Sequence, residues 1–132
     1  MDTFSNLADA RQVQEQTFLF TEDGVVETWF GETALPPLRG RKAIEDSWTP
    51  FLATFDTVYH VNGQFTAEID GDTATATHDC TVELIGEPEG AKTRNSNGVI
   101  YSDSYLRVNG EWLIAKRVAR FIWRDVHPFI AA

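Results

Sequence analysis

The sequence predicts an α+β fold in which a cone-shaped, highly curved and mostly antiparallel sheet packs against helices and leaves an internal cavity. Asn109-Gly110 separates two alternating runs within residues 98–123, and this dipeptide is the strongest short-range signal of a two-residue β-hairpin. Asp70-Gly71 divides residues 57–85 in the same way. Helical spacing is confined to residues 1–55, so a pocket is expected between the helices and the concave face of the sheet. An open two-layer sandwich without a cavity is the alternative fold.

The first half of the chain is expected to contain two helices and a short strand. Asp9–Phe20 reads as a helix, with apolar residues at helical spacing and Asp9 as the N-cap. A turn then leads into a strand at Val25–Phe30, which is rich in Val, Thr and aromatic residues. Lys42–Phe55 forms the second helix, with an apolar stripe on one side, and Pro50 favours a kink inside it.

The second half is expected to form four long antiparallel strands. Thr57–Ile69 and Thr73–Ile85 make the first hairpin, and Glu87–Asn97 is a polar loop with Pro and Gly. The closing hairpin around Asn109-Gly110 then runs to Trp123.

Composition limits the class of protein. The 132 residues suit a single domain, 1–132, and a hydrophobic content of 42% fits a globular chain. The net charge of −9 argues against nucleic acid and anionic membrane surfaces as partners. No apolar run approaches the ~20 residues of a membrane span, no signal peptide is visible, and the single Cys80 fits the reducing cytoplasm. Without metal-ligand spacing or a Gly-rich phosphate loop, we expect no cofactor and no metal.

His60 is the first candidate for catalysis, and the face on which it lies depends on one irregularity. Strict alternation places His60 with the polar residues of its strand. A β-bulge at Asn62-Gly63 turns it instead to the apolar face that lines the pocket, and a glycine within a strand often marks such a bulge. Histidine titrates near neutral pH and therefore suits acid–base chemistry. A pocket role and an ordinary surface or structural role both remain open.

Asp103 is the second catalytic candidate, because it lies between two tyrosines on one face of the closing hairpin. A regular hairpin places Asp103 opposite Lys116. Two interpretations follow. One is a cross-strand pair of Asp and Lys on a wet face, and the other is a carboxyl inside the cavity with a raised pKa. Arg107 and Arg117 are interpreted as structural residues.

Five further residues are candidates for substrate binding. Tyr101 can donate a hydrogen bond to an oxygen on which negative charge develops, and His78 lies on the apolar face by alternation alone. Three aromatic residues belong to elements that should cover the cavity: Phe18, Trp48 and Phe55. Plain core packing is the alternative for all five. An open pocket with such walls would take an apolar, ring-containing ligand.

Six short strings cover most of residues 18–123: Phe20-Thr-Glu-Asp23-Gly, Gly40-Arg-Lys-Ala-Ile44, Tyr59-His60, Ile69-Asp-Gly-Asp-Thr-Ala74, Tyr101-Ser-Asp103-Ser-Tyr105 and Trp112-Leu-Ile-Ala-Lys-Arg117. In this order and spacing they resemble the SnoaL-like branch of the nuclear transport factor 2-like superfamily. Its members include polyketide cyclases, ketosteroid isomerases, scytalone and bile-acid dehydratases, and non-catalytic modules. The resemblance implies the same cone-shaped fold.

The resemblance also implies roles for particular residues. His60 falls where dehydratase-like relatives place a catalytic histidine, and Asp103 falls near the cavity carboxylate of the isomerases and cyclases. Relatives usually begin with a longer first helix that carries a Tyr and an Asp into the cavity, whereas the first helix is shortened here. The second histidine of the dehydratases falls on Ile85, which cannot transfer protons.

Two classes of function therefore remain. One is a cofactor-free isomerase, dehydratase or cyclase that uses general acid–base chemistry on a small apolar molecule such as a polyketide, terpenoid or steroid. The other is a non-catalytic module that binds a small ligand or serves as an accessory subunit. In both cases we expect a homodimer formed through sheet faces. The face that would pair is rich in β-branched residues and weakly charged: Thr66, Thr73, Thr75 and Thr77.

Overall fold

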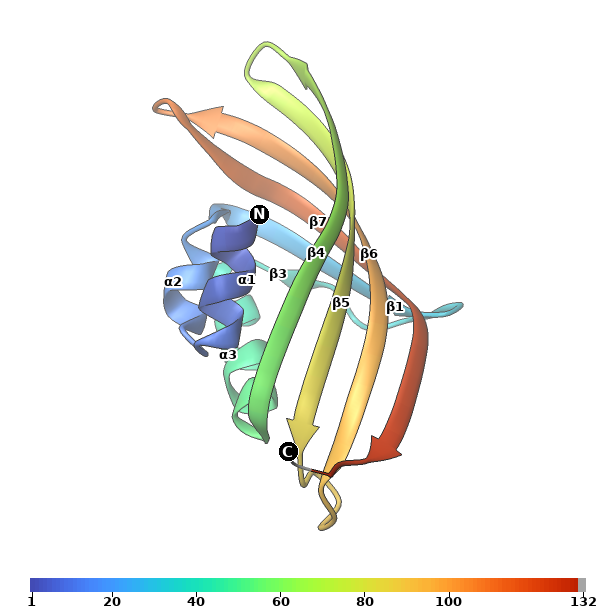
Figure 1. The fold of residues 1–132 in the computed structure, drawn as a ribbon. Helices are drawn as coiled ribbons and strands as arrows, with labels where there is room; N and C mark the ends of the chain where they lie inside the picture. Colours follow the sequence, from blue (N-terminus) through green and yellow to red (C-terminus); the bar gives the residue numbers. More distant parts are fainter. Residues whose placement is uncertain (131–132) are drawn as a thin grey trace.

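The computed structural model describes residues 1–130 as three helices packed against a curved, unclosed sheet of seven strands (Figure 1). The helices are α1 (Asp2–Asp9), α2 (Val13–Thr17) and α3 (Arg41–Ala53). The strands are β1 (Phe20–Phe30), β2 (Thr33–Ala34), β3 (Leu38–Arg39), β4 (Phe55–Asp70), β5 (Thr73–Gly86), β6 (Thr93–Val108) and β7 (Glu111–Pro128). None of these helices combines the length and the apolar content that a membrane span requires.

The topology confirms the predicted α+β cone. The strands follow the order β2-β1-β7-β6-β5-β4, and β3 pairs with β1. Within residues 1–130, β1 and β7 run parallel, while the other neighbouring strands are antiparallel. The three helices lie together on the concave side of the sheet (Figure 1). Buried side chains from both layers form the core between them.

The beginning of the chain differs from the predicted single helix over Asp9–Phe20. Helix α1 ends at Asp9, the backbone of Arg11 takes a left-handed φ of 58°, and α2 follows as a separate helix. Strand β1 begins at Phe20 rather than at Val25, with an irregular register where a turn was expected. Phe20 is fully buried beside β7, so the burial of this ring outweighs the local turn signal. Asp9 is therefore the last residue of a helix and not an N-cap.

Helix α3 follows the predicted helix over Lys42–Phe55 closely, with Pro50 inside its last turn. Its Trp48 packs edge-on against Phe4 of α1 and Phe20 of β1, with ring centroids 5.9 and 6.1 Å apart. Phe4 and Phe20 meet in the same way at 6.1 Å. Edge-to-face contacts of this kind add to the free energy that burial itself contributes. The three rings therefore join both longer helices to the sheet.

Both predicted hairpins are present, and one turn is shifted by a residue. Asn109-Gly110 joins β6 to β7 with φ values of 51° and 81°, as a type I′ turn requires. Between β4 and β5, however, Asp70 pairs with Thr73, so the turn is Gly71-Asp72 rather than Asp70-Gly71. Gly71 takes a φ of 61° there, which a glycine adopts without strain. The shift moves each cross-strand partner by two residues, so the predicted faces are unchanged.

Strand β6 begins at Thr93, inside the segment 87–97 that was expected to be a loop. The Arg94 guanidinium donates hydrogen bonds of 3.2 and 2.9 Å to Glu83 on β5, and the Ser96 hydroxyl donates to the same carboxylate. Cross-strand polar pairs stabilise a sheet in the way that apolar pairs do. The polar composition of this segment therefore extends the strand and does not end it.

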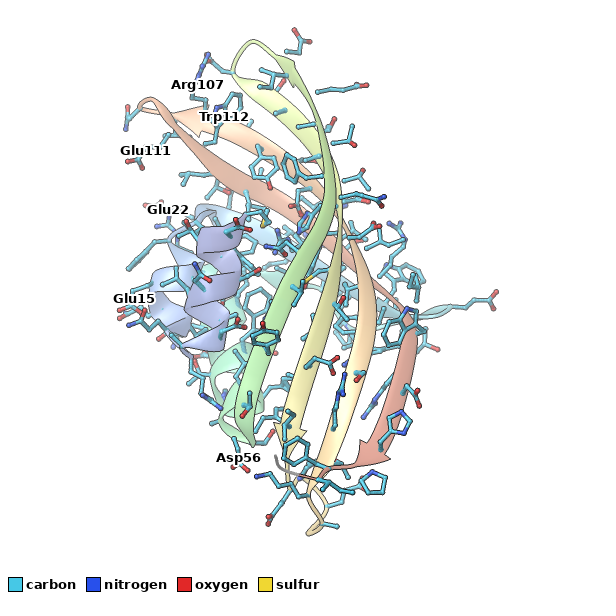
Figure 2. The ribbon with its side chains drawn as sticks, viewed as in Figure 1. Glu15, Glu22, Asp56, Arg107, Glu111 and Trp112 are labelled. Atoms are coloured by element: carbon cyan, nitrogen blue, oxygen red, sulfur yellow. The ribbon has the colours of Figure 1, made fainter. Side chains whose placement is uncertain are left out.

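An exposed ion pair joins the tips of the two hairpins. Arg107 of β6 lies 2.8 Å from the Asp72 carboxylate, and its guanidinium lies 5.1 Å from the ring centroid of Trp112 on β7. Figure 2 shows Arg107 and Trp112 together at this end of the sheet. Exposed pairs of this kind contribute about 1 kcal/mol or less to stability.

A β-bulge at the predicted place turns His60 toward the helices. Strands β4 and β5 lose their regular register between Asn62 and Phe65, a segment that contains Gly63. Below the bulge His60 pairs with Val82, whose side chain is buried in the core. Paired residues share a face of the sheet, so His60 lies on the concave face and the predicted flip is confirmed.

A second bulge changes the partner of Asp103. The register of β6 and β7 shifts by one residue between Asp103 and the turn, so that Asp103 pairs with Arg117. The prediction of Lys116 is wrong, because no glycine or other local signal marks this bulge in the sequence. Lys116 instead forms an ion pair of 3.2 Å with Glu27 of β1.

Candidate active site

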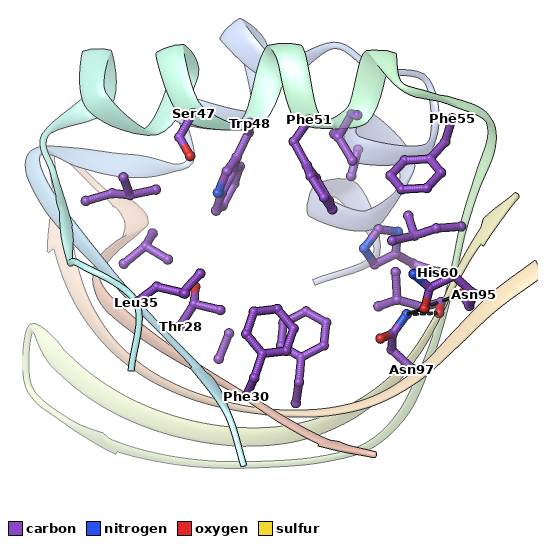
Figure 3. Close-up of a pocket in the computed structure, with 18 of the residues that line it drawn as sticks. Thr28, Phe30, Leu35, Ser47, Trp48, Phe51, Phe55, His60, Asn95 and Asn97 are labelled. Carbon is purple, nitrogen blue, oxygen red and sulfur yellow. Dashed lines mark hydrogen bonds between the residues drawn. The ribbon is translucent and has the colours of Figure 1, made fainter. Parts of the chain in front are cut away.

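A cavity of about 700 Å³ lies between α3 and the concave face of the sheet (Figure 3). Its walls are mostly apolar. Trp48 and Phe51 of α3 cover one side, and Phe30 of β1 and Phe121 of β7 lie opposite, with their ring centroids 4.7 Å apart. The volume is in the range of pockets that hold a drug-sized organic molecule.

At one end of this cavity His60 lies beside Asn95 and Asn97 of β6, and Ser47 and Thr28 lie at the other side (Figure 3). The Asn97 amide nitrogen donates to the Val82 carbonyl at 3.3 Å and to two oxygens of Asn95 at 3.2 Å each. These bonds fix the orientation of the Asn97 amide. Its Oδ1 has no protein partner within residues 1–130 and faces the cavity, so it is an acceptor available to a ligand.

His60 makes its closest polar contact with Asp9 at the end of α1. The ring Nδ1 lies 2.6 Å from Asp9 Oδ1, and the backbone N–H of His60 donates to Asp9 Oδ2 at 3.2 Å. With Nδ1–H as the donor to the carboxylate, the lone pair of the imidazole is on Nε2. Nε2 has no protein partner within residues 1–130, and the ring faces the cavity (Figure 3). It is therefore the atom that a ligand can meet.

The environment of His60 favours the neutral imidazole. Burial lowers the pKa of His60 below its usual 6.5, and the hydrogen bond and negative charge of Asp9 offset this effect only in part. The ring is therefore unprotonated at neutral pH. A neutral imidazole whose Nδ1–H is held by a carboxylate is the arrangement of a general base.

Helix α1 is fixed to β4 close to the bulge, and this contact positions Asp9. The Ser5 hydroxyl donates to the side-chain oxygen of Asn62 at 3.2 Å, and the Asn62 amide donates to Asp2 at 3.0 Å. Just beyond the helix, Arg11 donates to the Phe55 carbonyl at 2.5 Å. The residues that form the bulge thus also hold the helix that supplies the carboxylate.

Tyr101 contributes a second polar group to the cavity. Its ring is buried, and its hydroxyl has no protein partner within residues 1–130. Burial raises the pKa of Tyr101 above its ordinary value, so the hydroxyl stays protonated and can donate a hydrogen bond. A buried phenol of this kind can stabilise an oxygen on which negative charge develops.

Asp103 lies on the same face of the sheet but does not line the cavity. Arg117 donates from Nε to Oδ1 and from Nη2 to Oδ2, each at 2.8 Å, and the Tyr105 hydroxyl donates to Oδ2 at 2.9 Å. The side chains of Asp103 and Arg117 are 0% and 1% exposed. Arg117 itself lies between the rings of Phe4 and Tyr101 and reaches the cavity wall. His60 and Asp103 therefore do not meet in the cavity.

The structure divides the residues predicted to bind substrate into two groups. Trp48, Phe55 and Tyr101 line the cavity. His78 is buried outside it and stacks on Tyr101 with ring centroids 4.8 Å apart, and burial lowers the pKa of His78 to about 4. Phe18 is 54% exposed and carries the Arg41 guanidinium over its ring, away from the cavity.

Sequence reasoning missed two polar residues of the site. Asp9 was interpreted as an N-cap, and the aspartate that relatives carry on their first helix was expected to be missing here. Asn97 was placed at the end of a loop, because its polar neighbours conceal the strand. Alternation beyond Thr93 is the signal that would have placed Asn97 on the concave face.

Comparisons with known proteins point to one family and two kinds of relative. The family model of the SnoaL-like domain matches residues 1–118. An uncharacterized protein of Mycobacterium tuberculosis is 26% identical over 116 residues, which is 87% of this chain and 76% of that protein.

Two solved structures from Novosphingobium aromaticivorans share the fold. One, provisionally named a scytalone dehydratase, has a TM-score of 0.74 and 21% identity, and the match covers 100% of this chain and 85% of that one. The other is the β subunit of a provisionally named aromatic-ring-hydroxylating dioxygenase, with a TM-score of 0.76 and 15% identity over 92% of this chain and 84% of that one. At these identities the likeness shows the fold alone.

Proposed function

Because the chain belongs to the SnoaL-like domain family, we propose that it is a cofactor-free isomerase, dehydratase or cyclase that acts on a small apolar, ring-containing molecule. The observation that carries this proposal is the open Nε2 of His60, whose Nδ1 is held by Asp9 in a largely apolar cavity. A ligand that displaces water from an apolar cavity strengthens the electrostatic interactions within it.

In the proposed mechanism, His60 Nε2 takes a proton from a carbon next to a carbonyl group of the substrate. The positive charge that forms on the imidazole is stabilised by the Asp9 carboxylate. The Tyr101 hydroxyl donates a hydrogen bond to the carbonyl oxygen on which negative charge develops. The proton on Nε2 then returns to another carbon in an isomerisation, to a leaving hydroxyl in a dehydration, or to a new alkoxide in a cyclisation.

The cavity also indicates the class of substrate. Aromatic rings form two opposite walls, and His60, Asn95 and Asn97 lie together at one end (Figure 3). This division suits a flat, largely apolar molecule with oxygen atoms at one end, such as a polyketide, a terpenoid or a steroid-like compound.

We place the enzyme in the cytoplasm, where the single buried Cys80 stays a thiol.

A second candidate function is that of a non-catalytic accessory module. It is favoured by the position of Asp103, which does not line the cavity, and by the likeness to the β subunit of a dioxygenase. The two candidates differ in a simple way. An accessory module has no use for a free His60 Nε2, whereas a general base requires it.

We further propose that two chains pair through the outer face of the sheet. The four predicted threonines are exposed: Thr66, Thr73, Thr75 and Thr77. The exposed Tyr59 and Val61 alternate along β4 on the same outer face. Light scattering should give twice the mass of one chain, and a mass of one chain at high protein concentration would exclude the dimer.

The catalytic proposal is tested first by screening polyketide, terpenoid and steroid-like compounds for thermal stabilisation. A ligand at 100 times its dissociation constant stabilises the protein by about 2.7 kcal/mol. Turnover of each hit is then compared between the wild type, His60→Ala and His127→Ala. His127 is an exposed histidine near the end of β7, so it controls for the loss of an imidazole.

We expect His60→Ala to lower kcat by about 10²–10⁴-fold, because one positioned acid–base group contributes that much. His127→Ala should leave kcat unchanged, and both variants should fold. If His60→Ala retains nearly full turnover of a confirmed substrate, His60 is not the base. If the hits bind but none is turned over, the accessory-module function replaces the enzyme.

A further inference from the structure

A third bulge places Arg124 at the cavity. The register of β6 and β7 shifts by one residue where Val99 pairs with Phe121 but Gly98 pairs with Trp123. In a regular strand Trp123 would follow Phe121 onto the concave face, and Arg124 would point outward. The extra residue reverses this order, so that Arg124 joins Phe121 among the residues that line the cavity.

On the outer face of the sheet, a glycine makes room for the tryptophan that the bulge turns outward. Trp123 lies over Gly98, where an added Cβ would come within 2.1 Å of the indole Nε1. A side chain at this position would therefore prevent the indole from lying flat on β6. The bulge and Gly98 together place the indole of Trp123 on the outer face and turn Arg124, which remains exposed, toward the cavity. Regular alternation would have placed the apolar ring there instead, so this register favours a cation at the cavity.

Arg124 is held in place but not neutralised. Its Nε donates to the Asn95 side-chain oxygen at 3.1 Å, and Asn95 is buried and is also bound by the Asn97 amide. The two terminal nitrogens of Arg124 make no hydrogen bond or ion pair within residues 1–130. By contrast, Arg94 and Arg107 each pair with a carboxylate.

The surroundings define which anion would fit. The cavity offers apolar walls and the unpaired guanidinium of Arg124, and Glu89 also lines it. A carboxylate in the same cavity disfavours a dianion such as phosphate, whereas a planar monoanionic carboxylate matches the fork of two N–H groups. The chain carries a net charge of −9, so an anion needs a local cation of this kind to bind.

We propose that Arg124 binds a carboxylate of the ligand, so that the substrates of the proposed enzyme are ring-containing carboxylic acids. The inference deepens the proposed function and rests on the same cavity, with the rings between Trp48 and Phe121 and the carboxylate at Arg124. Arg124 is then a specificity-determining residue, since it acts on binding and touches no reacting atom.

The test is a binding experiment with two matched probes, naphthalene carboxylate and the uncharged naphthalene carboxamide. Calorimetry at neutral pH compares the wild type with Arg124→Gln and with Arg120→Gln. Arg120 lies four residues earlier on β7, does not line the cavity and makes no ion pair within residues 1–130, so the control carries the same change in net charge. Arg124→Lys keeps the charge without the fork.

We expect the wild type and Arg120→Gln to bind the carboxylate about 10- to 100-fold more tightly than the carboxamide, as for a hydrogen-bonded ion pair. Arg124→Gln should lose this preference, and Arg124→Lys should keep part of it. Equal binding of both probes by the wild type, including no binding of either, overturns the proposal. So does an equal loss in the two glutamine variants. His60→Ala should retain the preference, so a failure of the catalytic proposal remains distinguishable.

Discussion

Two aspartates, Asp9 and Asp103, each hold a basic side chain that lines the cavity, and only the Asp9 pair presents a titratable atom to it. Asp9 holds Nδ1 of His60 and leaves Nε2 free, whereas Asp103 has both oxygens bound by Arg117 and one of them also by Tyr105. The first arrangement can exchange a proton with a ligand. In the second, Arg117 lines the cavity and its Nη1 has no partner within residues 1–130, but a guanidinium stays protonated and cannot act as a base. The contrast shows that acid–base function requires a titratable atom facing a cavity, beyond a buried ionisable pair.

The difference follows from where each aspartate lies in the fold. Asp103 is in the middle of β6 with β5 and β7 on either side, so strands and rings surround it. Asp9 is the last residue of a short helix and reaches the sheet from the opposite layer. Asp9 thus joins the helix layer to the sheet beside the cavity, whereas Arg117 and Tyr105 enclose the carboxylate of Asp103 on the sheet.

The largest expected effect is the loss of stability on Asp103→Asn. The amide cannot accept both hydrogen bonds of Arg117, which stays buried between two aromatic rings without a counter-charge. Removing one partner of a buried pair destabilises a protein by about 3–5 kcal/mol. Urea denaturation of the variant should show this decrease in the free energy of unfolding.

The matched control is Asp72→Asn, which removes the carboxylate of the exposed pair with Arg107. We expect a change of about 1 kcal/mol or less there. If both variants lose the same small amount, Asp103 is not the structural centre that its burial indicates. If Asp103→Asn stays stable but loses turnover, the catalytic role that the sequence suggested for Asp103 would be restored.

A second prediction concerns His78, which is buried and whose Nδ1 has no hydrogen-bond partner among residues 1–130. Its pKa is lowered to about 4 by burial and by the charge of Arg117, against 6.5 in the unfolded chain. A lowered histidine pKa means that the unfolded state binds the proton more readily. The contribution to stability is therefore complete above pH 6.5 and is lost as the pH falls toward 4.

This linkage amounts to about 2 kcal/mol between neutral pH and pH 5. His78→Phe keeps an aromatic ring against Tyr101 but removes the titrating group. Denaturation at both pH values should show that the wild type loses about 2 kcal/mol more than the variant. His60 is present in both proteins, so its own titration cancels. An equal loss in the two proteins would show that the pKa of His78 is the same in the folded and the unfolded protein.

More of the fold than of the candidate site could be predicted from the sequence. Asn109-Gly110 and the alternation around it are local signals, and local signals specify hairpins and the faces of long strands. Gly63 marked the bulge that turns His60 inward. The beginning of the chain was misjudged, because the burial of Phe20 beside β7 is a tertiary effect that no local window contains.

The candidate site depended on two register shifts that the sequence analysis did not use, and only the second has a local mark, Gly98. The bulge between Asp103 and its turn exchanged Lys116 for Arg117, and a one-residue shift of this kind changes every partner along the strand. The same is true of the bulge before Trp123, which brings Arg124 to the cavity. Asp9 was visible as a residue, but its contact with His60 spans 51 positions and depends on helix packing.

The smallest expected effect is that of Tyr105→Phe. This change removes one hydrogen-bond donor from Asp103 and leaves the ion pair between Asp103 and Arg117 intact. The Tyr105 hydroxyl donates to Asp103 at 2.9 Å, and its ring is only partly buried and does not line the cavity. We expect a loss of about 1 kcal/mol in the free energy of unfolding, near the typical value for one hydrogen bond. Tyr59→Phe is the control, because Tyr59 is 56% exposed on the outer face. Binding of the naphthalene probes should be unchanged in both variants. A weaker affinity in Tyr105→Phe would mean that the hydrogen bonds of Asp103 influence ligand binding in the cavity. Asp103 could then no longer be treated as a purely structural residue, in contrast to Asp9.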